Sequence, residues 1–231
     1  MTINLFLSGG GDAKQTKKLD NAFASAVSGD RRVLYIPVAM PRSKFSPSQC
    51  FEWAKKTLGG VGLIDVTMWP NLSKRNFSDL RNYDAVYIGG GNTYGLLDKL
   101  RRNDFGDLLK RYLHKGGIVY GGSAGAIIFG RDIETAGFGG DSDRNFLGMT
   151  DFRGLNMLGG FSLHAHYSKS DDQAIKDYVA QKGIPTIALP EPSGIHFTGT
   201  SGRVIGAEPA VLFRKDGTIK VIKNGGRVKL K

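Results

Sequence analysis

Short apolar stretches alternate with longer amphipathic ones through the first half of the chain. The short stretches are apolar throughout, which is typical of strands buried on both faces of a sheet. The longer ones repeat apolar residues at helical spacing, as Phe51, Ala54 and Leu58 do. We predict strands at 3–7, 32–36, 63–68, 85–88 and 118–120, and helices at 12–28, 47–58, 93–101 and 105–115. This order predicts an α/β fold, with a mostly parallel sheet and helices on both faces.

The pattern changes in the second half. Residues 130–160 are irregular and rich in Gly and Asp, which predicts a long loop or lid that borders the site. After Pro192, short apolar runs and the hairpin signal Asp216-Gly217 predict antiparallel strands at the edge of the sheet. Further elements are predicted at 158–163 (strand), 170–181 (helix), 186–189 (strand), and in short strands at 195–197, 204–205, 210–213 and 219–221. No repeat or linker divides the chain, so we expect one domain over residues 1–231.

Composition and charge exclude several classes of protein. The single cysteine, Cys50, cannot form an intrachain disulfide, and without a Cys/His cluster a structural zinc site is not expected. The N-terminus lacks a basic region and no apolar stretch reaches 18 residues, so we expect a cytoplasmic protein that spans no membrane. The formal net charge is +11, and residues 214–231 carry much of the excess. No aromatic-interleaved basic stripe accompanies it, so nucleic acid is not expected as a partner.

Three glycine-rich turns follow predicted strands, at residues 8–11, 89–91 and 121–125. Ligands of such sheets bind beyond the carboxyl ends of the strands. In Gly121-Gly122-Ser123-Ala124-Gly125 a serine stands at the apex of a strand–turn–helix, flanked by the small residues that a crowded turn requires. This geometry favours a serine nucleophile.

A serine hydroxyl needs a base to remove its proton, and histidine is the usual one. His164 and His166 follow a predicted strand that ends at the same rim as Ser123, and alternation places both on one face. His196 lies in an apolar strand pattern and could be a base, a substrate contact or a satisfied core residue. His114 ends a helix at a surface boundary. We favour His166 as the base, with His164 and His196 as alternatives and candidate substrate contacts.

The third member of such a triad is a carboxylate that orients the imidazole. Glu191 directly follows a buried strand, and Pro190 and Pro192 fix the backbone on either side of it. The other candidates have plainer interpretations. Those are helix capping for Asp171 and Asp172, and solvated loop charge for Asp141, Asp143 and Asp151.

An acyl-transfer site also needs N–H donors for the oxyanion. The Ala124 amide, next to the serine at a helix start, is one candidate, and the turn Gly89-Gly90-Gly91-Asn92-Thr93 can supply another. Gly90 and Asn92 of this turn are candidate substrate contacts. The turn at 8–11 does not match GxGxxG, because Lys14 occupies the last glycine position, and no P-loop occurs. No cofactor is therefore expected.

The two motifs at 89–93 and 121–126, about thirty residues apart, resemble those of the peptidase E (aspartyl dipeptidase) and cyanophycinase family of serine peptidases. The resemblance covers roughly residues 3–213. It implies a class I glutamine-amidotransferase-like fold and a triad in the order Ser, His, acid, which matches Ser123, His166 and Glu191. It also matches Gly91 and Ala124 to the oxyanion amides.

The resemblance implies hydrolysis of small peptides, including dipeptides with an N-terminal aspartate, with no metal or cofactor. Residues 131–138 depart from the family pattern in the region that selects that aspartate. Two alternatives stay open, an esterase or amidase on the same triad and a non-catalytic ligand-binding protein on this scaffold. The chain could be a monomer or a homodimer.

Overall fold

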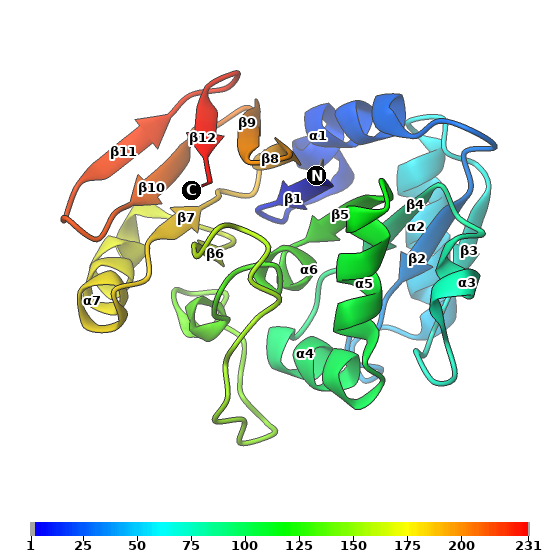
Figure 1. The fold of residues 1–231 in the computed structure, drawn as a ribbon, viewed down its shortest axis with the longest axis horizontal. Helices are drawn as coiled ribbons and strands as arrows, with labels where there is room; N and C mark the ends of the chain where they lie inside the picture. Colours follow the sequence, from blue (N-terminus) through cyan, green and yellow to red (C-terminus); the bar gives the residue numbers. More distant parts are fainter. Residues whose placement is uncertain (1–2, 231) are drawn as a thin grey trace.

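The computed structural model describes residues 3–230, so residues 1, 2 and 231 of the predicted domain lie outside it (Figure 1). Its main sheet has eight strands in the order β12-β9-β8-β1-β5-β4-β2-β3. The strands are β1 (Asn4–Ser8), β2 (Val33–Ile36), β3 (Val66–Met68), β4 (Ala85–Ile88), β5 (Ile118–Gly122), β8 (Ser193–Thr198), β9 (Ser201–Gly206) and β12 (Arg227–Lys229). The five neighbouring strands β1, β5, β4, β2 and β3 run parallel, and β8, β9 and β12 add antiparallel strands at one edge. The predicted fold class is confirmed.

Helices cover both faces of this sheet (Figure 1). Because side chains alternate along a strand, Phe6 of β1 packs into the core beneath α1 and α2, whereas Leu5 and Leu7 pack into the core beneath α4, α5 and α6. The helices are α1 (Ala13–Ala26), α2 (Pro47–Gly59), α3 (Phe77–Leu80), α4 (Thr93–Arg102), α5 (Phe105–His114), α6 (Ala124–Ile127) and α7 (Asp172–Lys182). The short helix α3 is the one that the apolar pattern missed.

A second sheet of four strands was not predicted. It has the order β11 (Ile219–Ile222), β10 (Ala210–Phe213), β7 (Thr186–Ala188) and β6 (Ser162–His164), and α7 packs against it. The sequence analysis placed β10 and β11 at the edge of the main sheet. Instead β10 pairs with β7, since an apolar run specifies that a strand is buried but not which strand it pairs with.

The register of the parallel strands brings the glycine-rich turns together. Ser8 at the end of β1 lies opposite Gly122 of β5, and Ile88 at the end of β4 lies opposite Gly121. The turns that follow these strands therefore share one edge of the sheet, as predicted.

Residues 131–161 are irregular, as predicted, apart from the 3-10 helix η1 (Glu134–Gly137) and an isolated bridge. A second 3-10 helix, η2 (Lys169–Asp171), precedes α7. The irregular segment is anchored to the nucleophile region, because Leu155 donates to the carbonyl of Ile128 (2.7 Å) and Met157 to that of Phe129 (2.8 Å). Its last part is thus packed against the chain that follows α6. Among residues 3–230, none of the helices combines the length and apolar character that crossing a membrane requires.

The core contains one buried carboxyl group whose charge should affect stability. Asp20 of α1 is 2% exposed and accepts hydrogen bonds from the hydroxyls of Thr16 (2.7 Å) and Tyr120 (2.8 Å). Burial raises the pKa of Asp20, and the two hydrogen bonds oppose that rise only in part. A carboxyl whose pKa is raised on folding stabilises the fold at low pH, and this contribution is lost as the pH rises through the folded-state pKa.

We therefore expect Asp20→Asn, which keeps an acceptor for Tyr120, to gain stability relative to the wild type between about pH 4 and about pH 7. Urea unfolding of both proteins at the two pH values measures this difference. If the free energy of unfolding of the wild type rose relative to that of the variant with increasing pH, the hydrogen bonds of the carboxylate would outweigh its desolvation.

Candidate active site

Ser123 stands at a sharp turn between β5 and α6. Its backbone has φ 51° and ψ −113°, a conformation that non-glycine residues rarely adopt. The turn is so tight that a Cβ on Gly121 would collide with the carbonyl of Gly125, and one on Gly125 with the carbonyl of Ile88. Small flanking residues are thus required here, and the serine hydroxyl is held at the carboxyl end of β5.

The His166 imidazole meets this hydroxyl. Ser123 Oγ and His166 Nε2 are 2.7 Å apart. His166 also has a left-handed backbone (φ 54°), and its N–H donates to the carbonyl of Gly9 (2.8 Å). Its ring lies so close to Gly10 that a Cβ there would overlap it. The turn after β1 therefore forms the surface against which the imidazole is positioned.

Glu191 occupies the other side of the ring. Its Oε1 lies 3.0 Å from His166 Nδ1, and its Oε2 accepts a hydrogen bond from Gln15 Nε2 (3.0 Å). Because a carboxylate only accepts, Nδ1 carries the proton in the neutral ring, and Nε2 is free to accept from the serine. The structure thus brings together Ser123, His166 and Glu191 in a geometry suited to proton transfer.

Gln15 is a site residue that the sequence analysis missed. Its side-chain oxygen accepts from the backbone N–H of Asp12 (2.9 Å), in a capping box at the start of α1. This bond fixes the amide so that its NH₂ faces Glu191. The spacing of Asp12 and Gln15 indicates the cap, but it does not indicate the contact with Glu191, which lies far along the chain.

The turn at 89–93 passes close to the serine. A Cβ on Gly90 would lie 3.3 Å from Ser123 Cβ, and Gly91 (φ 143°) packs so tightly on Ala39 that a side chain would collide with its carbonyl. Within residues 3–230, the N–H groups of Gly91 and Ala124 donate to no other protein group. Both are thus available to a ligand near Ser123. Asn92 is used structurally, as it caps Gly95 (2.9 Å) and donates to the carbonyl of Arg144 (2.9 Å).

His164 lies outside this cluster. It is 3% exposed, with Nδ1 3.0 Å from the carbonyl of Thr135 and Nε2 3.2 Å from Asp171 Oδ2. The expectation that His164 and His166 share a face was wrong. Strand β6 ends at His164, and the left-handed backbone at His166 breaks the alternation.

His196 is also not brought to Ser123, and the core interpretation describes it best. Its ring stacks on Phe6 with centroids 3.8 Å apart, and Nε2 lies 2.7 Å from Asn4 Oδ1. Burial lowers the pKa of His196 from 6.5 to about 4.

We expect His196 to stay neutral between about pH 5 and about pH 8, because burial disfavours the charged form of the ring. Its ring proton resonances in an NMR titration should shift with a midpoint of about 4. Since the folded-state pKa is lowered, the ring should also reduce stability as the pH falls below its unfolded-state pKa. A midpoint near the ordinary histidine value would show that the ring is solvated.

The acidic residues of the irregular segment differ in their surroundings. Asp151 pairs with Arg153 at the surface (2.6 Å). Asp143 is half-buried and accepts the N–H of Thr93 at the start of α4 (2.7 Å), so it is not the solvated charge that the sequence suggested. Burial raises the pKa of Asp143, while the hydrogen bonds from Thr93 lower it. Asp141 is exposed and lies beside His166 and Glu191.

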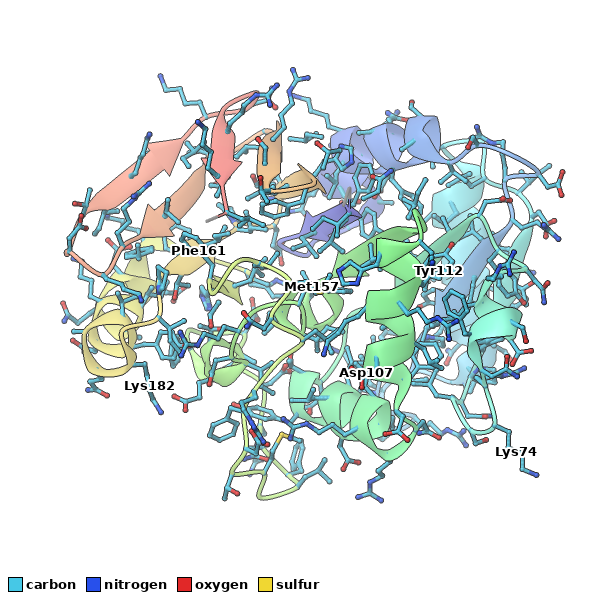
Figure 2. All side chains as sticks on the ribbon, viewed as in Figure 1. Lys74, Asp107, Tyr112, Met157, Phe161 and Lys182 are labelled. Atoms are coloured by element: carbon cyan, nitrogen blue, oxygen red, sulfur yellow. The ribbon has the colours of Figure 1, made fainter. Side chains whose placement is uncertain are left out.

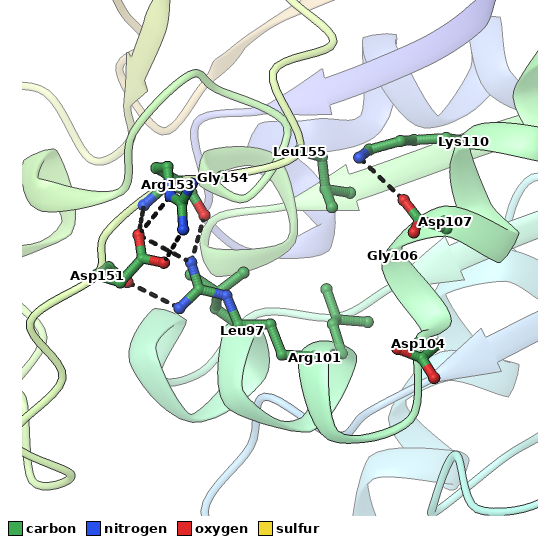
Figure 3. Close-up of a pocket in the computed structure, with 11 residues that line it drawn as sticks. Leu97, Arg101, Asp104, Gly106, Asp107, Lys110, Asp151, Arg153, Gly154 and Leu155 are labelled. Atoms are coloured by element: carbon green, nitrogen blue, oxygen red, sulfur yellow. Dashed lines mark hydrogen bonds and ion pairs between the residues drawn. The ribbon is translucent and has the colours of Figure 1, made fainter.

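A separate concave surface of about 380 Å³ lies between α4, α5 and residues 151–155 (Figure 3). Arg101 crosses it and donates to the carbonyls of Asp151 and Arg153, both at 2.8 Å. Lys110 pairs there with Asp107 (3.1 Å). Ser123, His166 and Glu191 do not line this surface, so it is separate from the site at Ser123.

Comparison with known proteins shows the family of the chain. The model of the family described as Peptidase family S51 matches residues 5–205. The chain is 28% identical over 149 residues to a Drosophila melanogaster protein named probable alpha-aspartyl dipeptidase. This match spans 60% of this chain and 60% of that relative's length. It is 24% identical over 193 residues to Peptidase E of Actinobacillus pleuropneumoniae, covering 79% of this chain and 78% of that one. The crystal structure of a peptidase from an acI-B1 actinobacterium superposes with a TM-score of 0.73 at 16% identity, covering 99% and 97% of the two chains, which shows a shared fold.

Proposed function

This chain belongs to peptidase family S51, and from that premise we propose that it is a serine peptidase that hydrolyses small peptides with Ser123, His166 and Glu191 as its catalytic residues. The observation that carries the proposal is the row of contacts from Ser123 Oγ to His166 Nε2 (2.7 Å) and from His166 Nδ1 to Glu191 (3.0 Å). Nucleophile, base and orienting carboxylate are thus within hydrogen-bonding distance in the order that acyl transfer requires.

In the first half-reaction, Ser123 Oγ attacks the carbonyl carbon of the scissile peptide bond and its proton moves to His166 Nε2. The oxyanion that forms accepts hydrogen bonds from the N–H groups of Gly91 and Ala124. His166 then gives the proton to the leaving amine, and the peptide bond breaks to leave an acyl ester on Ser123.

In the second half-reaction, water loses a proton to His166 and attacks the ester. The tetrahedral intermediate collapses, the acid leaves, and the proton returns to Ser123. Glu191 holds the Nδ1–H in place and stabilises the imidazolium in both halves. Gln15 positions Glu191 and does not touch the substrate.

The substrate class follows in part from the relatives. One is named an alpha-aspartyl dipeptidase and others Peptidase E, so dipeptides with an N-terminal aspartate are the first substrates to test. A panel should compare such dipeptides with others of the same size and with matched esters. Hydrolysis of the esters alone would instead assign an esterase.

A fluorophosphonate probe tests the activated serine without knowledge of the substrate. We expect one label per chain, mapped to Ser123 by mass spectrometry, and no label in His166→Ala, because the hydroxyl then lacks its base. A folded wild type that does not react would favour the ligand-binding alternative and contradict the proposal.

A further inference from the structure

Asp141 adds a third ionisable group to the row of His166 and Glu191. One potential ligand atom from each of the three residues lies within 4.8 Å of the other two. Asp141 is exposed, and the other two side chains are partly exposed, at 26% for His166 and 38% for Glu191. Solvent and small ions can therefore reach the group from the side of Asp141.

The segment that carries Asp141 is tied down close by. The Asp143 carboxylate accepts the N–H of Thr93 (2.7 Å), and the N–H of Asp143 donates to the carbonyl of Ala136 (2.7 Å). Asn92 of the turn beside Ser123 donates to the carbonyl of Arg144 (2.9 Å). These bonds hold the backbone next to Asp141 against the start of α4, so its carboxylate needs little further ordering to bind with the other two.

The charge of the group is not balanced by a protein cation. In the part of the chain that the structure describes, no lysine or arginine forms an ion pair with Asp141, and the only ion-pair partner of Glu191 is the His166 ring. Two carboxylates beside a neutral imidazole give a local charge of −2 on a chain whose formal net charge is +11. A divalent cation would neutralise it.

The donor set selects among divalent cations. One imidazole nitrogen with two carboxylate oxygens suits zinc better than calcium or magnesium, which prefer oxygen ligands alone. Three protein ligands with one water is a common coordination of zinc. Ligand atoms at about 2.1 Å from a tetrahedral zinc lie about 3.4 Å apart. The ligand atoms of the three residues lie within 4.8 Å of one another, so zinc binding requires them to adjust to that spacing.

We infer that Asp141, His166 and Glu191 form a binding site for a zinc ion, and that the bound ion switches off the peptidase. The inhibition rests on the proposed function, whereas the binding does not. Zinc on Nε2 would take the lone pair that accepts the serine proton. Zinc on Nδ1 would take the lone pair of that nitrogen and leave the ring proton on Nε2, which then could not accept from Ser123. In either case Ser123 loses its base, so this metal is an inhibitor and not a cofactor.

The test is a zinc titration of the tag-free protein against a chromophoric chelator at neutral pH. We expect one zinc per chain in the wild type and an affinity weakened about tenfold or more in Asp141→Asn. Ser123→Ala keeps all three ligands and should bind as the wild type does. Asp107→Asn, which removes a carboxylate on α5 outside the group (Figure 2), is the matched control and should also bind normally.

A second measurement follows fluorophosphonate labelling of Ser123. Zinc should slow labelling of the wild type, a chelator should restore it, and Asp141→Asn should be insensitive at the same zinc concentration. A wild type without zinc affinity, or an Asp141→Asn protein that binds as tightly as the wild type, would overturn the site. Zinc binding by the wild type and by Ser123→Ala, with no labelling or peptide hydrolysis in the wild type, would leave the site standing and remove the peptidase proposal instead.

Discussion

Ser123→Ala should lower kcat/KM for peptide hydrolysis by about 10⁴-fold or more, because it removes the atom that attacks the substrate. Any remaining rate would come from substrate binding and the oxyanion amides acting on water. The fold should persist, since alanine keeps the Cβ and occupies the same strained backbone position (φ 51°) as serine. The hydroxyl makes a single part-buried hydrogen bond, to His166, so stability should fall by about 1 kcal/mol or less.

The measurement is steady-state hydrolysis of the best dipeptide by wild type and variant, with thermal unfolding of both. We expect turnover to be lost while the melting temperature stays within about 4 °C of the wild-type value. Full activity in a folded Ser123→Ala protein would eliminate the acyl-enzyme mechanism.

Glu191→Gln should lower kcat/KM by about 10³- to 10⁴-fold, although it changes only a carboxylate into an amide. The reason lies in Gln15, whose NH₂ faces residue 191 and is held there by the capping box with Asp12. A glutamine at position 191 must turn its oxygen toward that NH₂, so its own NH₂ faces His166 Nδ1. Nδ1 then becomes the acceptor and Nε2 carries the proton, which is the tautomer that cannot accept from Ser123.

This explanation predicts a partial rescue by a second substitution. Gln15→Met removes the donor that fixes the amide, so the glutamine introduced at position 191 can turn its oxygen toward His166. The double variant, with both Glu191→Gln and Gln15→Met, should therefore be more active than Glu191→Gln alone. Gln15→Met alone should cause a smaller loss than Glu191→Gln, because the carboxylate still faces the ring. A double-mutant cycle on kcat/KM measures the coupling, and additive losses would show that Gln15 does not set the orientation of residue 191.

Several contacts of the site were beyond the reach of the sequence for definite reasons. The positions of Gln15 and Asp141 beside the His166–Glu191 pair depend on where α1 and the irregular segment pack. Both residues also have ordinary local roles, as a capping residue and a loop charge. The histidines show the same limit. His164 and His166 are two positions apart and look equivalent by alternation, but a left-handed backbone at His166 turns only that ring toward Ser123.

The sequence by itself determined the buried strands, the main helices, the turn at Ser123 and the family resemblance. All of these depend on short-range causes, namely the spacing of apolar side chains and the small residues that a crowded turn tolerates. Only the tertiary structure decided that β10 and β11 pair in a second sheet, that His164 is buried while His196 stacks on Phe6, and that Gln15 and Asp141 flank Glu191 and His166. Those outcomes depend on which distant segments pair, and a local pattern of polar and apolar residues does not encode its partner.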